Sequence, residues 1–252
     1  MKNSMTPYYY RYLRDCVARI RSQLLYAACH FMPQMPYGKR VMIVAPHPDD
    51  ETFGAGAYIC SLLANGSKVR VVVLSSGGRS LGDSDDSTEV ERQRELLCLR
   101  ATSILGLGED DVVFLRQPDG SVLTDSDMVG QLRYEVESWK PDMLLSPGFG
   151  EVWSDHINTA KVVLHIANNN CMVYHYWVWS WYYNTLSWYG RMYCNIGGRS
   201  CCSVKQKAVD VYIKSKRSDG NVWSGNLPML LIKCIRQDNE IFCKMTVCND
   251  NK

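Results

Sequence analysis

A short apolar run ends abruptly in a charged turn at residues 41–51, which read VMIVAPHPDDE. Val41 to Ala45 are too few for a helix and lack polar alternation, so they predict a strand buried on both faces of a parallel sheet. Pro46 and Pro48 bias the residues before them toward extended angles, which places the charged residues just beyond this strand. Ligand sites in open α/β sheets form at the carboxyl ends of strands, so this turn is the first candidate site.

The turn carries one histidine and three carboxylates: His47, Asp49, Asp50 and Glu51. His47 and Asp50 supply an imidazole and a carboxylate from one tight turn, which is half of a metal-ligand set. Asp49 and Glu51 then point elsewhere. The alternative interpretation is a solvated acidic turn that caps the helix expected over residues 52–64.

Strand and helix patterns alternate after this turn. Strands are expected over residues 68–75, 112–115 and 142–146, and helices over 88–105, 125–139 and 157–167. The alternation predicts an α/β, Rossmann-like fold with a mainly parallel sheet, helices on both faces and a site at the carboxyl ends of the strands. Further on, we expect a loop over 190–202, a helix over 204–217 and a C-terminal hairpin over 228–247.

A second histidine follows a later strand of this sheet. Residues 148–156, GFGEVWSDH, run off the strand expected at 142–146, and His156 opens the next helix. Because parallel strands end at one edge of a sheet, we expect His156 to join His47 and Asp50 as a third ligand. Two histidines and one carboxylate also form the ligand set of non-haem Fe(II) oxygenases, which is the alternative chemistry.

Two other segments bear on a substrate site. Residues 76–87 are rich in glycine, serine and aspartate and follow the strand at 68–75, so they lie on the same rim and suit a substrate lid or a mobile loop. Residues 171–184, CMVYHYWVWSWYYN, predict an aromatic strand. Its alternate side chains either pack within the sheet or present flat faces to a sugar ring.

Composition indicates an ordinary globular chain. The 252 residues carry a net charge of +2, with 46% hydrophobic and 21% charged residues, which gives no general attraction to nucleic acid. Eleven cysteines without a CxxC pair, and no signal peptide, predict a reduced, cytoplasmic protein.

The first segment differs in charge from the rest. Residues 7–31 predict a basic amphipathic helix, which either packs across the domain or lies on the inner, anionic face of a membrane. We therefore expect residues 1–38 to form this helix and a connector, and residues 39–252 to form a single α/β domain. A homo-oligomer is also compatible with this sequence.

These motifs together resemble a known family. PHPDDE at a first strand end, with Asp155 and His156 opening a later helix, resembles N-acetylglucosaminyl-phosphatidylinositol deacetylase (PIG-L) and the LmbE-like zinc deacetylases. The likeness runs from about residue 41 to 167, and more faintly to 217. It implies one Zn²⁺ held by His47, Asp50 and His156, with Asp49 as general base. It also implies that Asp155 is the acidic neighbour of the third ligand, and that Arg94 binds substrate.

The sequence departs from the family pattern at the site itself. Trp153 replaces a family histidine that helps to stabilise the tetrahedral intermediate, and Leu97 replaces a glutamate three residues after Arg94. The resemblance implies a zinc-dependent hydrolase that removes the N-acetyl group from an N-acetylated amino sugar or glycoconjugate. The alternatives are the Fe(II) oxygenase and a sugar-binding homologue with impaired catalysis.

Overall fold

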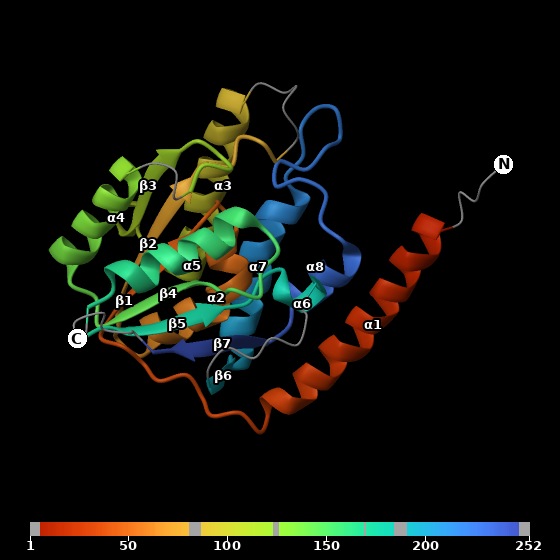
Figure 1. Cartoon of the computed structure of the whole chain (residues 1–252), viewed down its shortest axis with the longest axis horizontal. Helices are drawn as coiled ribbons and strands as arrows, with labels where there is room; N and C mark the ends of the chain where they lie inside the picture. Colours follow the sequence, from red (N-terminus) through yellow and green to blue (C-terminus); the bar gives the residue numbers. More distant parts are fainter. Residues whose placement is uncertain (1–5, 81–86, 123–125, 169, 184–190, 247–252) are drawn as a thin grey trace.

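A seven-stranded sheet lies at the centre of the molecule, in the order β3-β2-β1-β4-β5-β7-β6 (Figure 1). The computed structural model describes residues 6–80, 87–122, 126–168, 170–183 and 191–246. The strands are β1 Arg40–Ala45, β2 Lys68–Ser75, β3 Val112–Gln117, β4 Met143–Pro147, β5 Met172–Tyr176, β6 Arg191–Ile196 and β7 Asn239–Met245. Strands β1 to β5 pair in parallel, whereas β7 is antiparallel to both β5 and β6. The predicted mainly parallel sheet is confirmed.

Helices cover both faces of the sheet, as predicted (Figure 1). They are α1 Thr6–Cys29, α2 Asp50–Ala64, α3 Ser87–Leu105, α4 Ser126–Trp139, α5 Ser154–Ile166, α6 Ser180–Tyr183, α7 Arg199–Lys214 and α8 Met229–Ile235, with a 3₁₀ turn η1 at Glu109–Asp111. Alternate residues of β1 reach the two layers, because successive side chains of a strand point to opposite faces. Ile43 belongs to the apolar cluster that includes residues of α2, α3 and α7, and Val44 belongs to the cluster that includes residues of α4 and α5.

The direction in which the strands are added reverses beside β1. From β1 the chain builds β2 and β3 on one side, then returns to place β4 and β5 on the other. The carboxyl ends of β1 and β4 therefore flank a topological switch point, where loops leave in opposite directions and open a crevice. His47 follows β1 and His156 follows β4, so the switch point brings them together.

The hairpin expected over residues 228–247 is wrong. Residues 229–235 form α8, and β7 follows it as one strand inserted between β5 and β6. The loop expected over 190–202 is also wrong, because residues 191–196 form β6 and α7 begins at Arg199. Both strands find partners far away in the chain, which local patterns do not reveal.

The aromatic strand expected over residues 171–184 is shorter than predicted. Strand β5 ends at Tyr176, and Ser180–Tyr183 form the short helix α6. The buried carboxylate of Glu151 explains the turn, because it accepts hydrogen bonds of 2.7 to 3.1 Å from the backbone N–H groups of residues 178, 179 and 180. Three successive amides that point at one carboxylate cannot continue a strand.

Helix α1 lies along the edge of the molecule against α6 and α8 (Figure 1). Its Arg21 Nη2 donates to the backbone carbonyls of Ser180 at 3.3 Å and Trp181 at 2.7 Å. The helix predicted over 7–31 is confirmed, whereas the division into a segment 1–38 and a domain 39–252 stays a prediction. Within the described ranges, no helix has the length and apolar character needed to cross a bilayer.

Candidate metal centre and active site

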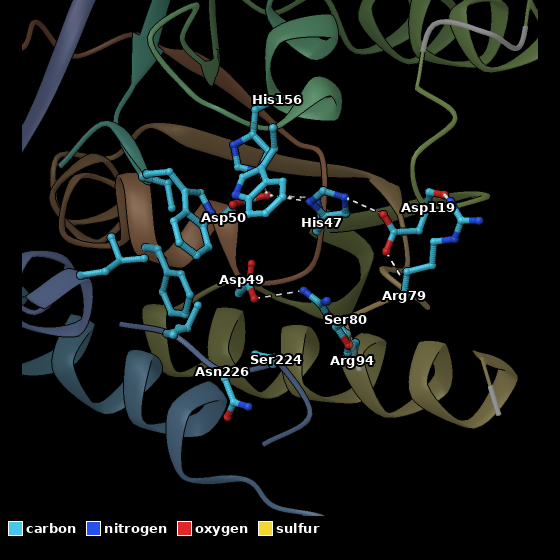
Figure 2. A pocket seen from close by; sticks show the side chains of 17 residues that line it. His47, Asp49, Asp50, Arg79, Ser80, Arg94, Asp119, His156, Ser224 and Asn226 are labelled. Atoms are coloured by element: carbon cyan, nitrogen blue, oxygen red, sulfur yellow. Dashed lines mark hydrogen bonds and ion pairs between the residues drawn. The ribbon is translucent and has the colours of Figure 1, made fainter. Parts of the chain in front are cut away.

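A pocket of about 400 Å³ opens at the switch point (Figure 2). His47, Asp49 and Asp50 enter it from the turn after β1, and His156 enters it from the first turn of α5. The sequence predicted that these side chains share one edge of the sheet, and the structure places them there. Of the loop expected over 76–87, Arg79 and Ser80 line the pocket, while residues 81–86 lie outside the described residues.

Three side chains converge on one point in this pocket. Asp50 Oδ2 lies 3.4 Å from His47 Nδ1 and 3.4 Å from His156 Nε2. One ligand atom from each residue lies within 4.8 Å of the others. Asp50 and His156 are almost completely buried, and His47 is partly exposed toward the pocket. Two imidazoles and a carboxylate in this arrangement can hold a divalent cation.

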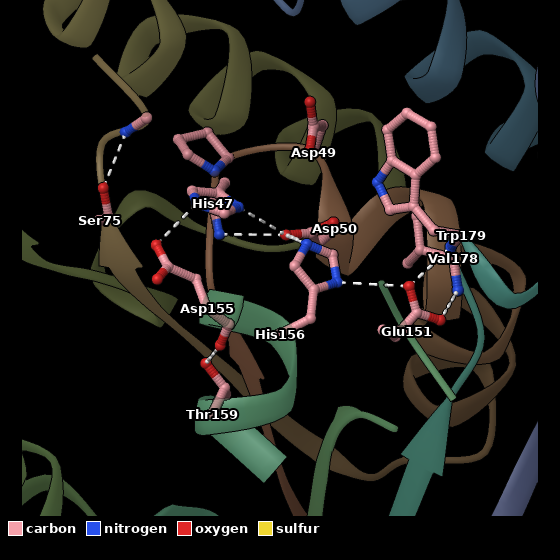
Figure 3. Close-up of polar contacts among 12 residues, drawn as sticks. His47, Asp49, Asp50, Ser75, Glu151, Asp155, His156, Thr159, Val178 and Trp179 are labelled. Atoms are coloured by element: carbon pink, nitrogen blue, oxygen red, sulfur yellow. Dashed lines mark hydrogen bonds and ion pairs between the residues drawn. The ribbon is translucent and has the colours of Figure 1, made fainter. Parts of the chain in front are cut away.

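Each histidine contacts a carboxylate through the ring nitrogen that faces away from this point (Figure 3). His156 Nδ1 lies 3.4 Å from Glu151 Oε2, and His47 Nε2 lies 3.3 Å from Asp155 Oδ2 and 3.1 Å from Asp119 Oδ1. A proton on the outer nitrogen leaves the inner lone pair free, as in histidines that bind metal.

The carboxylates around His47 and His156 favour a positive charge at this position. Burial disfavours a charged imidazole, yet the surrounding carboxylates raise the pKa of both His47 and His156 above its usual value. The site therefore attracts positive charge despite its burial, and a divalent cation would supply that charge without protonating the rings. On this observation the residues present fit a bound metal ion.

Asp49 lies beside the cluster but is not part of it. Its backbone φ is 126°, an unfavourable angle for a residue with a side chain, and its N–H donates to Glu51 Oε2 at 3.0 Å. Its carboxylate accepts a hydrogen bond of 3.0 Å from Arg94 Nη2. Burial, opposed by Arg94, raises the pKa of Asp49 to about 8. A strained backbone thus holds this carboxylate in the pocket.

The Arg94 side chain occupies space that only a glycine at position 77 leaves free. It donates to the carbonyls of Pro48 and Gly77 as well as to Asp49, and is almost fully buried. Gly77 has φ +69°, and a Cβ there would stand 2.6 Å from Arg94 Nη1. Arg94, which the family resemblance implied as a substrate-binding residue, therefore lines the pocket and supports Asp49, and its role in binding substrate stays a prediction.

Glu51 and Asp155 lie behind the pocket rather than in its lining. Glu51 is fully buried and accepts hydrogen bonds of 2.7 Å from Thr52 Oγ1 and Tyr212 Oη, in addition to that from the Asp49 amide. Asp155 accepts from the Gly120 N–H at 2.8 Å and contacts His47. Both carboxylates position the turn and its histidine.

Trp153 stands at the rim of the pocket, with 49% of its surface exposed. Its ring packs edge to face with Trp179 at 5.6 Å between centroids. Phe53, Leu227 and Leu231 also line the pocket, so part of its lining is apolar. These three residues and the two tryptophans are here named the aromatic wall.

The sequence prediction missed two carboxylates of the site, Asp119 and Glu151. Asp119 follows β3, so it stands on the same edge of the sheet as the other strand ends, and that position was the available signal. Glu151 lies within the stretch 148–156 that leads to His156. Its link to the backbone of residues 178–180 is a tertiary contact with no local pattern.

Comparison with known proteins gives a consistent result. The family model PIG-L, described as GlcNAc-PI de-N-acetylase, matches residues 42–167. A "Probable N-acetyl-alpha-D-glucosaminyl L-malate deacetylase 2" of Bacillus anthracis is 29% identical over 133 residues, which are 50% of this chain and 58% of that protein. A 1D-myo-inositol 2-acetamido-2-deoxy-alpha-D-glucopyranoside deacetylase of Kineococcus radiotolerans is 31% identical over 124 residues, 46% of this chain and 33% of that protein.

The matches thus span less than two thirds of either curated relative. A solved structure, N,N'-diacetylchitobiose deacetylase from Pyrococcus horikoshii, shares the fold with a TM-score of 0.60 at 18% identity, covering 87% of this chain and 82% of that one. The family model covers half of the sequence, including the charged turn after β1 and His156. The chain belongs to the PIG-L family.

Proposed function

We propose that this protein is a metal-dependent hydrolase that removes the N-acetyl group from an N-acetylated amino sugar or a glycoconjugate carrying one. The position of Asp49 carries the proposal. This buried carboxylate lines the same pocket as the His47, Asp50 and His156 cluster, is held by Arg94, and is not one of the converging ligands. A carboxylate in that place is suited to proton transfer beside a metal site.

We assign Zn²⁺ to His47, Asp50 and His156, because two imidazoles and one carboxylate form a common ligand set of catalytic zinc. Zn²⁺ bound there would polarise an amide carbonyl and lower the pKa of a water molecule to about 7. Glu151 and Asp155 would hold the two imidazoles in the ligand orientation.

Asp49 then has two proton transfers to perform. It takes a proton from the attacking water, whose oxygen forms a bond to the acetyl carbon. The amide C–N bond breaks, and Asp49 returns the proton to the departing nitrogen, which leaves acetate and a free amine. Arg94 keeps the carboxylate oriented through both steps with its 3.0 Å hydrogen bond. The same residue carries both transfers, so its loss affects the whole reaction.

The pocket wall suits a sugar as the substrate. Trp153 and Trp179 line the pocket with aromatic side chains, and Arg79 and Asn226 line it with polar ones. Figure 2 shows Arg79 beside Asp119. Aromatic faces combined with a few polar groups are a common way to bind a ring that has both apolar and hydroxyl-bearing sides. The two matched relatives are named as deacetylases of N-acetylglucosaminyl compounds, which supports this substrate class.

Two alternatives make different use of the same residues. An Fe(II) oxygenase would use His47, Asp50 and His156 as metal ligands, but its reaction requires no general base, so Asp49 would have no role. A sugar-binding homologue with impaired catalysis is favoured by Trp153, which removes the family histidine from the rim. In that case substrate would bind, and hydrolysis would be slow.

We also propose a reducing, cytoplasmic location. The ten cysteines in the described part of the chain are all free, and eight of them are buried as small apolar side chains.

The test is acetate release from a panel of N-acetylhexosamine conjugates by metal-free protein, with Zn²⁺ or Fe²⁺ added back. The proposal predicts that Zn²⁺ restores release on at least one conjugate. Conjugate binding with stoichiometric Zn²⁺ and no acetate would favour the impaired homologue, and oxidised product with Fe²⁺ would favour the oxygenase.

A further inference from the structure

The outer face of helix α1 is apolar although it faces solvent. Leu13, Val17, Ile20 and Leu24 expose 49%, 54%, 60% and 66% of their surfaces. With the exposed Ala27 they form a continuous row, here named the α1 stripe. The opposite face of α1 is the one packed on the domain, where Ala18, Ser22, Leu25 and Cys29 are buried. Among the described residues, α1 therefore has a second apolar face that is exposed to solvent.

The spacing of the α1 stripe is that of a coiled-coil seam. Its residues follow one another at intervals of four, three, four and three, and Phe31, four residues further and 91% exposed, continues the row just beyond the helix. A strict alternation of three and four gives a narrow seam that matches a second helix of the same kind, whereas a helix packed on a globular core shows a wider apolar face.

Charge at the edges of the stripe favours a protein partner over a lipid surface. A helix that lies on a membrane keeps its polar face in water and presents Lys and Arg to anionic lipid. Here the opposite face is packed on the domain. Arg14 and Arg21, which flank one edge of the stripe, bond to their own chain: Arg14 Nη2 donates to Tyr182 Oη at 2.8 Å, and Arg21 Nη2 donates to the Trp181 carbonyl at 2.7 Å. Arg19, also beside the stripe, is exposed to solvent.

We propose that the α1 stripe pairs with the α1 stripe of a second copy of this chain, which makes the protein a symmetric dimer. Self-pairing places the same residues on both sides of a twofold axis, so one apolar row is sufficient for the interface. If their exposed surface were fully covered, the four large stripe residues and Phe31 would contribute at most roughly 600 Å² per chain, or about 1,200 Å² for two copies, which reaches the lower end of the range for stable interfaces.

The place of α1 in the molecule permits this pairing. The helix lies at the edge of the domain, with its buried face toward α6 and α8 and its outer face away from the sheet (Figure 1). None of the stripe residues lines the pocket. The inference is therefore independent of the proposed function.

Sedimentation velocity of the full chain over a range of concentrations tests the proposal. The wild-type chain is expected to sediment as a dimer with a dissociation constant on the order of micromolar. Changing Ile20→Glu together with Leu24→Glu puts two charges at the centre of each seam and should weaken association at least about 100-fold. Because these side chains are exposed in one chain, the variant should keep the wild-type melting temperature and circular dichroism. Leu24→Ala, a milder change, should weaken association less.

The matched control is Ile104→Glu on α3, an isoleucine that is 39% exposed and lies outside the stripe. It should leave the dimer intact. Three outcomes would overturn the proposal: a wild-type monomer at all concentrations, a dimer that survives both stripe variants, or a monomer that binds vesicles of equal parts phosphatidylserine and phosphatidylcholine through the stripe. The last result would assign α1 to a membrane surface instead.

Discussion

The two parts of this sheet contribute differently to the pocket. Residues 40–167, with the parallel strands β1 to β4, supply the charged groups His47, Asp49, Asp50 and His156. Residues 171–246, which add β5 and the antiparallel strands β6 and β7, supply mostly the wall, including Val178, Trp179 and Asn226. The family model covers residues 42–167, which lie in the first part. The charged groups of the pocket therefore come mainly from the part that the family model covers, and apolar lining residues come from both parts.

The second part also supports the first from behind. Tyr212 of α7 donates to Glu51, which holds the Asp49 amide, and the amides of residues 178–180 hold Glu151 against His156. The division is therefore one of roles rather than of independent units. Changes in the first part should alter turnover, and those in the second should alter stability or substrate affinity.

Removal of the proposed base should have the largest effect. Asp49→Asn keeps the shape of the side chain but cannot accept the proton, so kcat should fall by about 100- to 10,000-fold. Bound metal should stay stoichiometric, because Asp49 is not one of the converging ligands. Acetate release and metal analysis check both, with the exposed Asp110→Asn as control. Turnover within threefold of wild type would show that Asp49 is not the general base.

A buried ion pair in the second part should matter for stability instead. Lys205 Nζ lies 2.8 Å from Glu240 Oε1, and both side chains are 2% exposed. Lys205→Met leaves the buried Glu240 carboxylate without its counter-ion, although the N–H groups of Ala57 and Tyr58 still donate to it at 2.8 Å. The loss should lower the free energy of unfolding by about 3 to 5 kcal/mol. Denaturant unfolding measures the loss. Adding Glu240→Gln should restore part of it, and a single variant as stable as wild type would show that the pair is not needed.

The contact between the two parts should affect the metal. Glu151→Gln keeps the size of the side chain but removes the charge that faces His156 Nδ1, so metal affinity should fall about 10- to 100-fold. Competition with a chelator measures this affinity. Glu95→Gln, which changes a carboxylate bound to Ser76 and Arg116 away from the cluster, is the control. Equal metal affinity in the two variants would show that Glu151 does not contribute to metal binding.

The aromatic wall should affect substrate rather than chemistry. Trp179→Ala removes a flat face from the pocket, so KM should rise about 5- to 30-fold, as expected for the loss of 1 to 2 kcal/mol of contact, with kcat little changed. Steady-state kinetics on the preferred conjugate separates the two constants. A fall in kcat with KM unchanged would place Trp179 in the reaction itself.

A pH-dependent effect on stability concerns His175 on β5, the strand at which the sheet changes from parallel to antiparallel. Burial lowers the pKa of His175 to about 4. Because the folded state binds this proton less readily than the unfolded state, its contribution to stability is full above pH 6.5 and is lost as pH falls toward 4. Between pH 7 and pH 5 the loss should be about 2 kcal/mol.

His175→Leu should remove this part of the pH dependence. Unfolding by denaturant at both pH values measures the change for the variant and for wild type. If both lose the same stability on acidification, His175 is not the group responsible.

The sequence was most informative where structure is local. Each βα unit is complete within a short stretch of sequence. Local patterns up to residue 167 therefore predicted the strands, the helices and the edge of the sheet that His47 and His156 share. They failed where pairing is distant. Strand β7 joins β5 and β6 from the far end of the chain, and Glu151 ends the aromatic strand through three amides. The same limit applies to the site, where Asp50 was apparent and Glu151 was not.

Isotope labelling is the most direct test of hydrolysis at this pocket. The zinc-loaded wild-type chain would react with its preferred N-acetylated conjugate in water enriched in ¹⁸O, with the acetate read by mass spectrometry. A hydrolase places one oxygen from water in each acetate, and Asp49→Asn should form this labelled product at a greatly reduced rate. Acetate formed without the label would contradict the proposed function.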